Sequence, residues 1–148
     1  MQTLASLSFA PGPDAVPKAL AWLESIAKQE NWHKRTAFKL ILCLDEVLSN
    51  VVMYGFQDGN QDAGVACIAL SILAGEQEIA LDIIDNGIPF DPTLAVTRGL
   101  AESMDDAAIG GHGLRLMRHY LRDIHYRREG DKNHLRLTAI ADTDKTEP

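Results

Sequence analysis

The chain has 148 residues, of which 46% are hydrophobic and 24% charged, as in an ordinary globular domain. Its formal net charge of −7 argues against a nucleic-acid binder, because such proteins present basic surfaces to the phosphates. No apolar run is long enough to cross a bilayer, and the N-terminus lacks a secretion signal. We therefore expect a cytoplasmic protein with one domain spanning 1–148, a core at about 3–141 and a polar, frayed tail at 142–148.

The first third of the chain predicts one strand and two helices. Residues Thr3 to Phe9 alternate as in a strand. Apolar residues at helical spacing then predict an amphipathic helix from Asp14 to Lys28, with Asp14 as its N-cap. The segment from Lys34 to Tyr54 is apolar over most of its circumference, so we expect a second helix that is largely buried.

The remaining elements surround a long segment with weak periodicity. That segment, Ile88 to Gly113, is rich in glycine and proline, and its length is typical of a functional loop. We expect its first part, Ile88 to Gly110, to form a lid over a site. The other predicted elements are strands at Val65 to Leu73 and Glu78 to Asp85, a helix at Leu114 to Leu121, and strands at Asp123 to Arg128 and Leu135 to Ala141.

Charge is unevenly distributed along the chain. Residues 40–97 contain nine acidic residues and no Lys or Arg, a charge of −9, while the remainder has 14 bases against 12 acids, or +2. A phosphate ligand beside this acidic middle would need a divalent cation to offset the repulsion.

The two cysteines, Cys43 and Cys67, do not show the paired spacing of a zinc or redox site, so we expect two buried thiols.

Glu46 and Asn50 are polar residues four positions apart on the predicted apolar helix, so they share one face. A hydrogen-bonded pair at a solvated rim would explain them without any function. A functional interpretation is that the Asn50 side-chain oxygen binds Mg²⁺, which prefers oxygen ligands. Glu46, one turn away, would then be a general base for the attacking hydroxyl.

The sequence Asp85-Asn86-Gly87 follows an apolar strand. Asn-Gly is a common turn dipeptide, but Ile88-Pro89 does not begin a convincing return strand. A carboxylate at the end of such a strand can accept a hydrogen bond from an adenine amino group. A following glycine lets the ring approach the backbone closely.

A glycine cluster, Gly110-Gly111-His112-Gly113, precedes the predicted helix at Leu114. Unpaired N–H groups at such a helix start suit phosphate, although a plain hinge would have the same composition. The cluster matches neither the P-loop nor the Rossmann pattern. Backbone amides and a metal would therefore have to hold the phosphates.

Together, in this order and spacing, the three motifs resemble those of the GHKL ATPase superfamily, which includes histidine kinases and anti-sigma-factor serine kinases. The resemblance covers about Leu40 to Leu137. Glu46 and Asn50 match its asparagine motif, and the two glycine motifs are matched by Asp85 with Gly87 and by Gly111 with Gly113. The short chain is most similar to the anti-sigma-factor kinases, since Met1 to Lys39 has no room for a phosphoacceptor segment.

The resemblance implies the Bergerat fold, a two-layer α/β sandwich with a mixed, mainly antiparallel sheet and helices on one face. It implies Asp85, Gly87, Gly111, Gly113 and Asn50 as ATP ligands, with Asn50 also holding Mg²⁺ and Glu46 as the catalytic base. The implied activity is phosphorylation of a small anti-sigma-factor antagonist on serine or threonine, with a sigma factor as second partner and a homodimer as the assembly. Tyr54, where the group often has His, and His112 between the motif glycines depart from the pattern. An ATP-bound switch without phosphotransfer and a scaffold without nucleotide are the alternatives.

Overall fold

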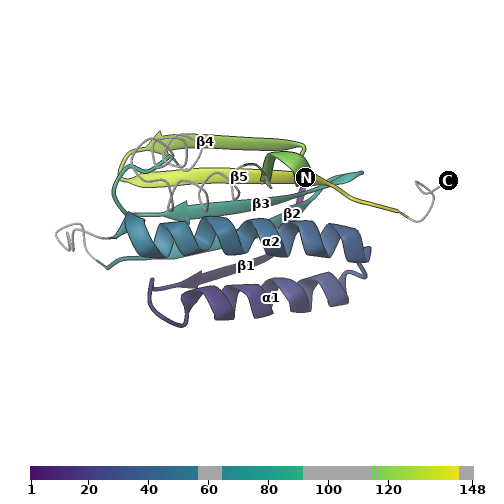
Figure 1. Ribbon diagram of the computed structural model, residues 1–148, viewed down its shortest axis with the longest axis horizontal. Helices are drawn as coiled ribbons and strands as arrows, with labels where there is room; N and C mark the ends of the chain where they lie inside the picture. The colour runs from purple at the N-terminus through teal and green to yellow at the C-terminus, as the bar shows by residue number, and fades with distance from the viewer. Residues whose placement is uncertain (57–64, 92–114, 116, 144–148) are drawn as a thin grey trace.

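One antiparallel sheet organises the residues that the computed structural model describes, which are 1–56, 65–91, 115 and 117–143. The strands lie in the order β1-β2-β3-β5-β4, and each neighbouring pair is antiparallel. Figure 1 shows the elements, which follow the chain as β1 (Gln2–Phe9), α1 (Ala15–Gln29), α2 (Lys34–Asn50), the π-helical turn η1 (Val51–Gly55), β2 (Ile68–Ala74), β3 (Glu78–Asp85), β4 (Asp123–Glu129) and β5 (Lys132–Ile140).

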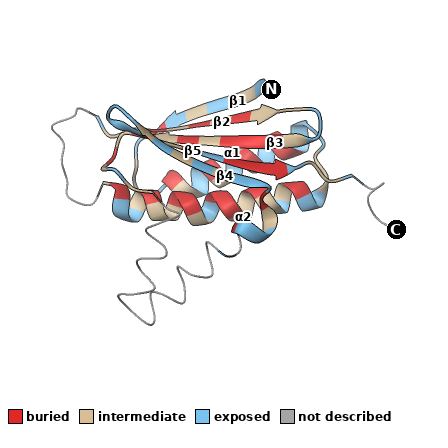
Figure 2. Cartoon of the chain, turned by 90° about the horizontal axis from the view of Figure 1, so that it is seen from above, coloured by how far each residue is buried: buried red, intermediate tan, exposed pale blue. Residues whose placement is uncertain are grey.

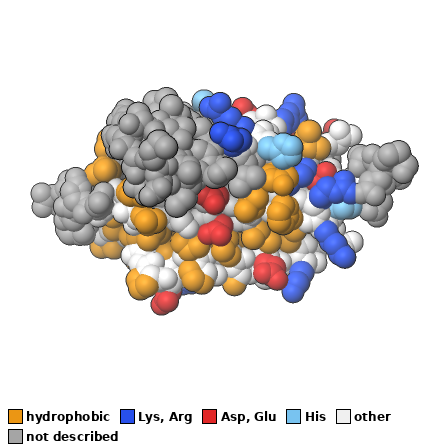
Figure 3. Space-filling view, in the orientation of Figure 1, with side chains coloured by type: hydrophobic (Ala, Val, Ile, Leu, Met, Phe, Trp, Pro, Cys, Tyr) orange, Lys and Arg blue, Asp and Glu red, His pale blue; other side chains and the backbone are white. Residues whose placement is uncertain are grey.

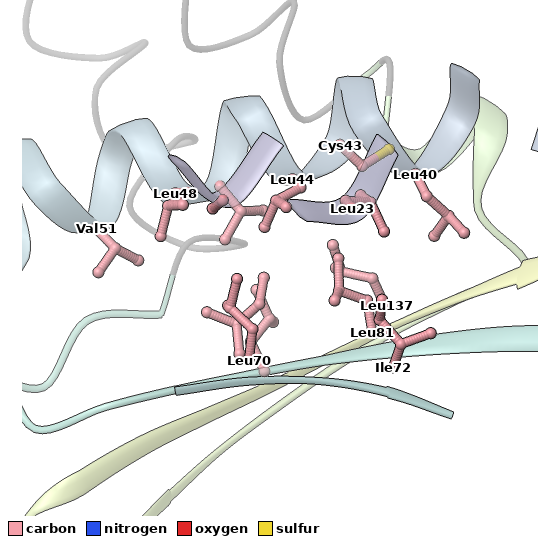
Figure 4. Close-up of a cluster of buried hydrophobic side chains, with 14 of the residues drawn as sticks. Leu23, Leu40, Cys43, Leu44, Leu48, Val51, Leu70, Ile72, Leu81 and Leu137 are labelled. Carbon is pink, nitrogen blue, oxygen red and sulfur yellow. The ribbon is translucent and has the colours of Figure 1, made fainter. Parts of the chain in front are cut away.

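Helices α1 and α2 cover one face of the sheet, so the fold has two layers (Figure 2). The core lies between these layers because both surfaces are apolar there. In Figure 4, Leu23, Leu44 and Leu48 on the helices face Leu70 and Leu81 on the strands, and all five are fully buried. The predicted two-layer α/β sandwich with helices on one face is therefore confirmed, and every pairing among the described strands is antiparallel.

The strand positions decide which side chains reach the core. Strand β3 has the predicted bounds at both ends, and its partner β5 places Leu135 and Leu137 inward as expected. Strand β5 begins at Lys132, three residues earlier than predicted, because the β4–β5 turn needs only Gly130, at φ 61°, and Asp131. Asn133, which was expected in a turn, is therefore a strand residue opposite Asp85.

Several local expectations differ from the structure. The long helix is regular only to Asn50 and then widens into η1. Asp14 occupies the N-cap position of α1, but its side chain makes no capping hydrogen bond. Cys43 is buried, whereas Cys67 is exposed, because it precedes β2 in a stretch outside the sheet.

The start of the expected polar tail is anchored to α2. The Thr36 hydroxyl donates to Asp142 Oδ2 at 3.0 Å, and the Asp142 N–H donates to Thr36 Oγ1 at 2.8 Å. Lys39 Nζ lies 2.7 Å from the same carboxylate, and both side chains are only 14% exposed. Asp142 is thus not frayed; residues 144–148 lie outside the described part of the chain.

Of the predicted helix at Leu114 to Leu121, the structure describes Arg115 and residues 117–120 as helical. Leu121 follows the last helical residue, and its N–H donates to the Met117 carbonyl at 2.8 Å. Within the described residues, no helix is long and apolar enough to cross a membrane.

Candidate nucleotide site

The candidate site lies where the end of β3 meets η1, the turn that follows α2. The Ile88 N–H donates to the Gly55 carbonyl at 2.9 Å, which joins the chain after β3 to the last residue of η1. The rings of Tyr54 and Phe90 also approach, with centroids 6.3 Å apart. Asn50 precedes Gly55 by five residues, about 7 Å along a helical axis. The asparagine motif and the first glycine motif thus lie near one another.

Asp85 is a buried carboxylate at this junction, with 5% exposure. Its Oδ1 accepts hydrogen bonds from the Gly87 N–H and from Asn133 Nδ2, both at 2.9 Å. Burial raises the pKa of Asp85, while these two hydrogen bonds and the charges of Arg128 and His134 act to lower it. Among the described residues, no hydrogen bond ends on Oδ2, so this oxygen is available to a donor on a ligand.

Gly87 is required by the packing of the protein itself. A Cβ at this position would collide with the Gly55 carbonyl oxygen and would lie 3.0 Å from the Gly55 carbonyl carbon and 3.1 Å from Asp85 Oδ1. The sequence suggested a glycine that admits the adenine ring. The structure adds a second reason, which is the close approach of two backbone segments.

Asn86 links this turn to the start of β2. Its Oδ1 accepts from the Cys67 N–H at 2.8 Å, and its Nδ2 donates to the Val65 carbonyl at 2.9 Å. The Asn86 N–H also donates to the Cys67 carbonyl at 3.3 Å. The side chain therefore extends the β2–β3 pairing by one step and secures the position of Asp85.

Glu46 and Asn50 lie on α2 one turn apart and are both half-buried. Burial raises the pKa of Glu46, and the neighbouring Asp45 carboxylate raises it further. Burial, followed by the charge of Glu46, raises the pKa of the Cys43 thiol to about 12, so that thiol stays protonated. In Figure 3, acidic side chains lie among the hydrophobic ones over α2.

The donor set suits a hard cation beside Asn50. The Asn50 side chain makes no capping hydrogen bond to η1, and its amide oxygen is of the kind that can act as a ligand. Asp45, by contrast, is exposed and accepts a hydrogen bond from Ser49 at 3.2 Å. A neutral amide oxygen with a carboxylate one turn away fits Mg²⁺, which keeps several waters and takes few protein ligands.

The second glycine motif lies outside the described residues. This applies to Gly111, Gly113 and His112 and to the part of the expected lid from 92 to 110. The described part of that lid is Ile88 to Asp91, and its first residues are bound to the sheet. The Ile88 carbonyl accepts from Asn133 Nδ2 at 2.8 Å, and the Phe90 N–H donates to Asn133 Oδ1 at 3.2 Å.

Three residues on β4 and β5 contribute to the site without having been predicted. Asn133 bonds to Asp85, the Tyr126 hydroxyl donates to Asn133 Oδ1 at 2.5 Å, and Arg128 Nη1 donates to the Gly87 carbonyl at 2.9 Å. Sequence reasoning missed them because they reach the site only through the β3–β5–β4 register. The available signal was one polar residue, Asn133, just before the alternating Leu135 and Leu137.

The chain is similar to known proteins in both sequence and fold. A family model described as a histidine kinase-like ATPase domain matches residues 9–139. The serine/threonine-protein kinase BtrW of Bordetella bronchiseptica is 46% identical over 121 residues, which are 82% of each chain. A chain in the crystal structure of the SiaB–SiaC complex from Pseudomonas aeruginosa superposes with a TM-score of 0.61, covering 94% of this chain and 91% of that one at 13% identity. That last likeness concerns the fold alone.

Proposed function

The chain belongs to the histidine kinase-like ATPase family, and we propose that it is an ATP-dependent protein serine/threonine kinase of the anti-sigma-factor type. The family match over residues 9–139 confirms the resemblance drawn from the three motifs. The kinase activity is proposed because BtrW, a serine/threonine-protein kinase, is 46% identical over most of both chains.

The observation that supports ATP binding best is the state of Asp85. Its carboxylate is buried, and the described protein donors occupy Oδ1 alone. A carboxylate whose second oxygen accepts from none of the described residues can accept an N–H group from a ligand. We propose that the 6-amino group of adenine donates to Asp85, with Gly87 keeping the turn close to η1. Gly111 and Gly113 are proposed to bind phosphate.

The catalytic residues are proposed on α2. Asn50 would hold Mg²⁺ through its side-chain oxygen, and the bound ion would offset the phosphate charge beside the acidic middle of the chain. Glu46 would take the proton of the substrate hydroxyl as that oxygen bonds to the γ-phosphorus and the bond to ADP breaks. The raised pKa of Glu46 suits this role, because a more basic carboxylate accepts a proton more readily.

The proposed substrate is a small protein of the anti-sigma-factor antagonist type, which would accept phosphate on serine or threonine. A sigma factor is the proposed second partner, held when the antagonist is phosphorylated, and a homodimer is the proposed assembly. The reaction would take place in the cytoplasm, where ATP is available. These proposals follow the resemblance to anti-sigma-factor kinases and the identity to BtrW.

Transfer of label from ATP tests the function directly. The protein is incubated with labelled ATP, Mg²⁺ and purified candidate antagonists, and label on one of them is the expected result. Glu46→Gln should reduce transfer by about 10²-fold or more while ATP affinity changes little, because the amide cannot accept the proton. Asn50→Ala should lose both ATP affinity and transfer.

Asp45→Asn is the matched control for Glu46→Gln. It removes a neighbouring carboxylate that is exposed and bonded to Ser49 and that adds only the smaller part of the shift in the Glu46 pKa, so transfer should fall far less than in Glu46→Gln. Equal losses in both variants would contradict the assignment of Glu46. Tight ATP binding without label on any partner would instead support the non-catalytic switch.

A further inference from the structure

Asn133 is a buried amide, 3% exposed, that is held by four hydrogen bonds. Its Nδ2 donates to Asp85 Oδ1 at 2.9 Å and to the Ile88 carbonyl at 2.8 Å. Its Oδ1 accepts from the Tyr126 hydroxyl at 2.5 Å and from the Phe90 N–H at 3.2 Å. Turning the amide over would place its NH₂ group against the Phe90 N–H, which can only donate, and its oxygen against two acceptors, Asp85 Oδ1 and the Ile88 carbonyl. These partners therefore select one orientation.

The Tyr126 hydroxyl anchors the amide in this orientation, although it makes no hydrogen bond to Asp85. It donates to the Asn133 oxygen and so holds the amide in place while its nitrogen faces the carboxylate. Asp85 Oδ1 then receives two donors, from Asn133 and Gly87, and these donors favour the ionised, acceptor-only form against the effect of burial. Oδ2 is the oxygen that remains for a ligand.

We propose that Tyr126 and Asn133 are positioning residues that make Asp85 selective for purines carrying a 6-amino group. Tyr126 anchors the Asn133 amide, whose orientation is set by the Phe90 N–H and the two acceptors, and Asn133 holds the carboxylate so that its remaining oxygen accepts an N–H from the base. A carboxylate that cannot donate leaves a 6-keto or unsubstituted purine without this hydrogen bond. This inference rests on the proposed binding of ATP.

The Asn133 amide also connects base recognition with the segment that follows Gly87. The Ile88 carbonyl and the Phe90 N–H bind the two ends of the Asn133 amide, so a change in its orientation must also release this segment. Arg128 holds the preceding Gly87 carbonyl from β4. The β4–β5 hairpin thus positions both the carboxylate and the first residues after it.

Nucleotide selectivity tests the proposal, because a merely structural role would weaken all nucleotides alike. ATP and purine riboside triphosphate, which lacks only the 6-amino group, are titrated by calorimetry into the wild-type chain and into Tyr126→Phe and Asn133→Ala. The wild type should prefer ATP by about tenfold or more. Each variant should lower this ratio to about threefold or less, mainly through weaker ATP binding.

Tyr120→Phe is the matched control. It removes a tyrosine hydroxyl from a ring that packs edge-to-face on Phe38, away from Asp85, so the preference for ATP should persist. Melting curves identify any variant that fails to fold. If the wild type binds ATP and the folded variants Tyr126→Phe and Asn133→Ala keep its preference for ATP, the inference is overturned while the proposed function still stands. Failure of the wild type to bind ATP would overturn the proposed function as well.

A further variant, Asn133→Asp, gives a pH readout. In its protonated form the new carboxyl group could donate to Asp85 as the amide does, whereas two ionised carboxylates at this distance repel each other. ATP affinity of the variant should therefore fall as the pH rises from about 5 to about 8, relative to the wild type. Among the described residues, Arg128, His134 and Asp91 are the other charged or titratable groups that act on Asp85 or Tyr126, and the wild type contains all three. If the ATP affinities of Asn133→Asp and the wild type change with pH in the same way, the positioning role of Asn133 is contradicted.

Discussion

At the residue scale, Gly87 shows how closely two backbone segments approach within the site. The absent side chain is what lets the turn after Asp85 lie against Gly55, where the Ile88 N–H makes its hydrogen bond. Any larger residue must push the two segments apart. Asp85, Asn50 and the first residues of the long loop would then lose their relative positions.

Gly87→Ala should therefore destabilise the protein by about 1–3 kcal/mol, the usual cost of inserting a methyl group into a packed site. The free energy of unfolding is measured by urea titration. ATP affinity should fall in the same variant, because Asp85 shifts with the turn. Gly12→Ala is the control, since a Cβ there meets no atom within 4 Å. Equal stability of the two variants would contradict the packing argument.

At the scale of elements, Asp142 fastens the chain after β5 to the first turns of α2. Burial by itself would raise the pKa of its carboxyl, but the hydrogen bonds from Lys39 and Thr36 and the positive charges of Lys39 and Arg35 hold that pKa below its usual value. The folded state therefore binds this proton more weakly than the unfolded state does. The contribution to stability is fully present above the unfolded pKa, about 4, and is lost as the pH falls through the folded pKa.

Asp142→Asn should lower the free energy of unfolding by about 1–2 kcal/mol at pH 7, since it weakens a charge-assisted hydrogen-bond network. The difference from wild type should shrink at about pH 3, where the wild-type carboxyl also loses its charge. Urea titrations at both pH values measure this. Asp14→Asn, at an exposed N-cap that makes no side-chain capping bond, should change little at either pH. A difference that grows toward acid would contradict the sign of the linkage.

At the scale of the whole molecule, the candidate site draws on both layers of the fold. Asn50 belongs to the helical layer and Asp85 to the sheet, and the core of fully buried leucines, including Leu44 and Leu81, holds the layers together. A ligand that contacts both layers must stabilise the folded state over the unfolded one, because it binds only when the layers are packed.

Mg²⁺-ATP should accordingly raise the melting temperature. At a concentration of about 100 times Kd the stabilisation is about 2.7 kcal/mol, or several degrees for a domain of this size. Differential scanning fluorimetry with and without nucleotide measures the shift. Asp85→Ala should bind more weakly and show a smaller shift. No shift in the wild-type protein would support the scaffold that binds no nucleotide.

The sequence by itself determined the features that depend on neighbouring residues. The alternation of apolar residues set the bounds of β3 and placed Asp85 at its end, and the spacing of Glu46 and Asn50 put them on one helical face. Local periodicity carries this information because each element buries one side. Local periodicity could not predict that Asp142 is anchored, because its partners, Thr36 and Lys39, lie on another element.

Only the tertiary structure decided which distant residues meet at the site. Asn133 reaches Asp85 across 48 positions because β5 pairs with β3 in one register, and Tyr126 joins them through the β4–β5 pairing. The contact of Gly55 with Gly87 depends likewise on where η1 ends. Strand register is a property of paired segments, and a shift of one residue would turn every side chain to the opposite face. For that reason the pattern of residues along the chain could predict the Asp85 carboxylate but not Asn133 and Tyr126, which position it.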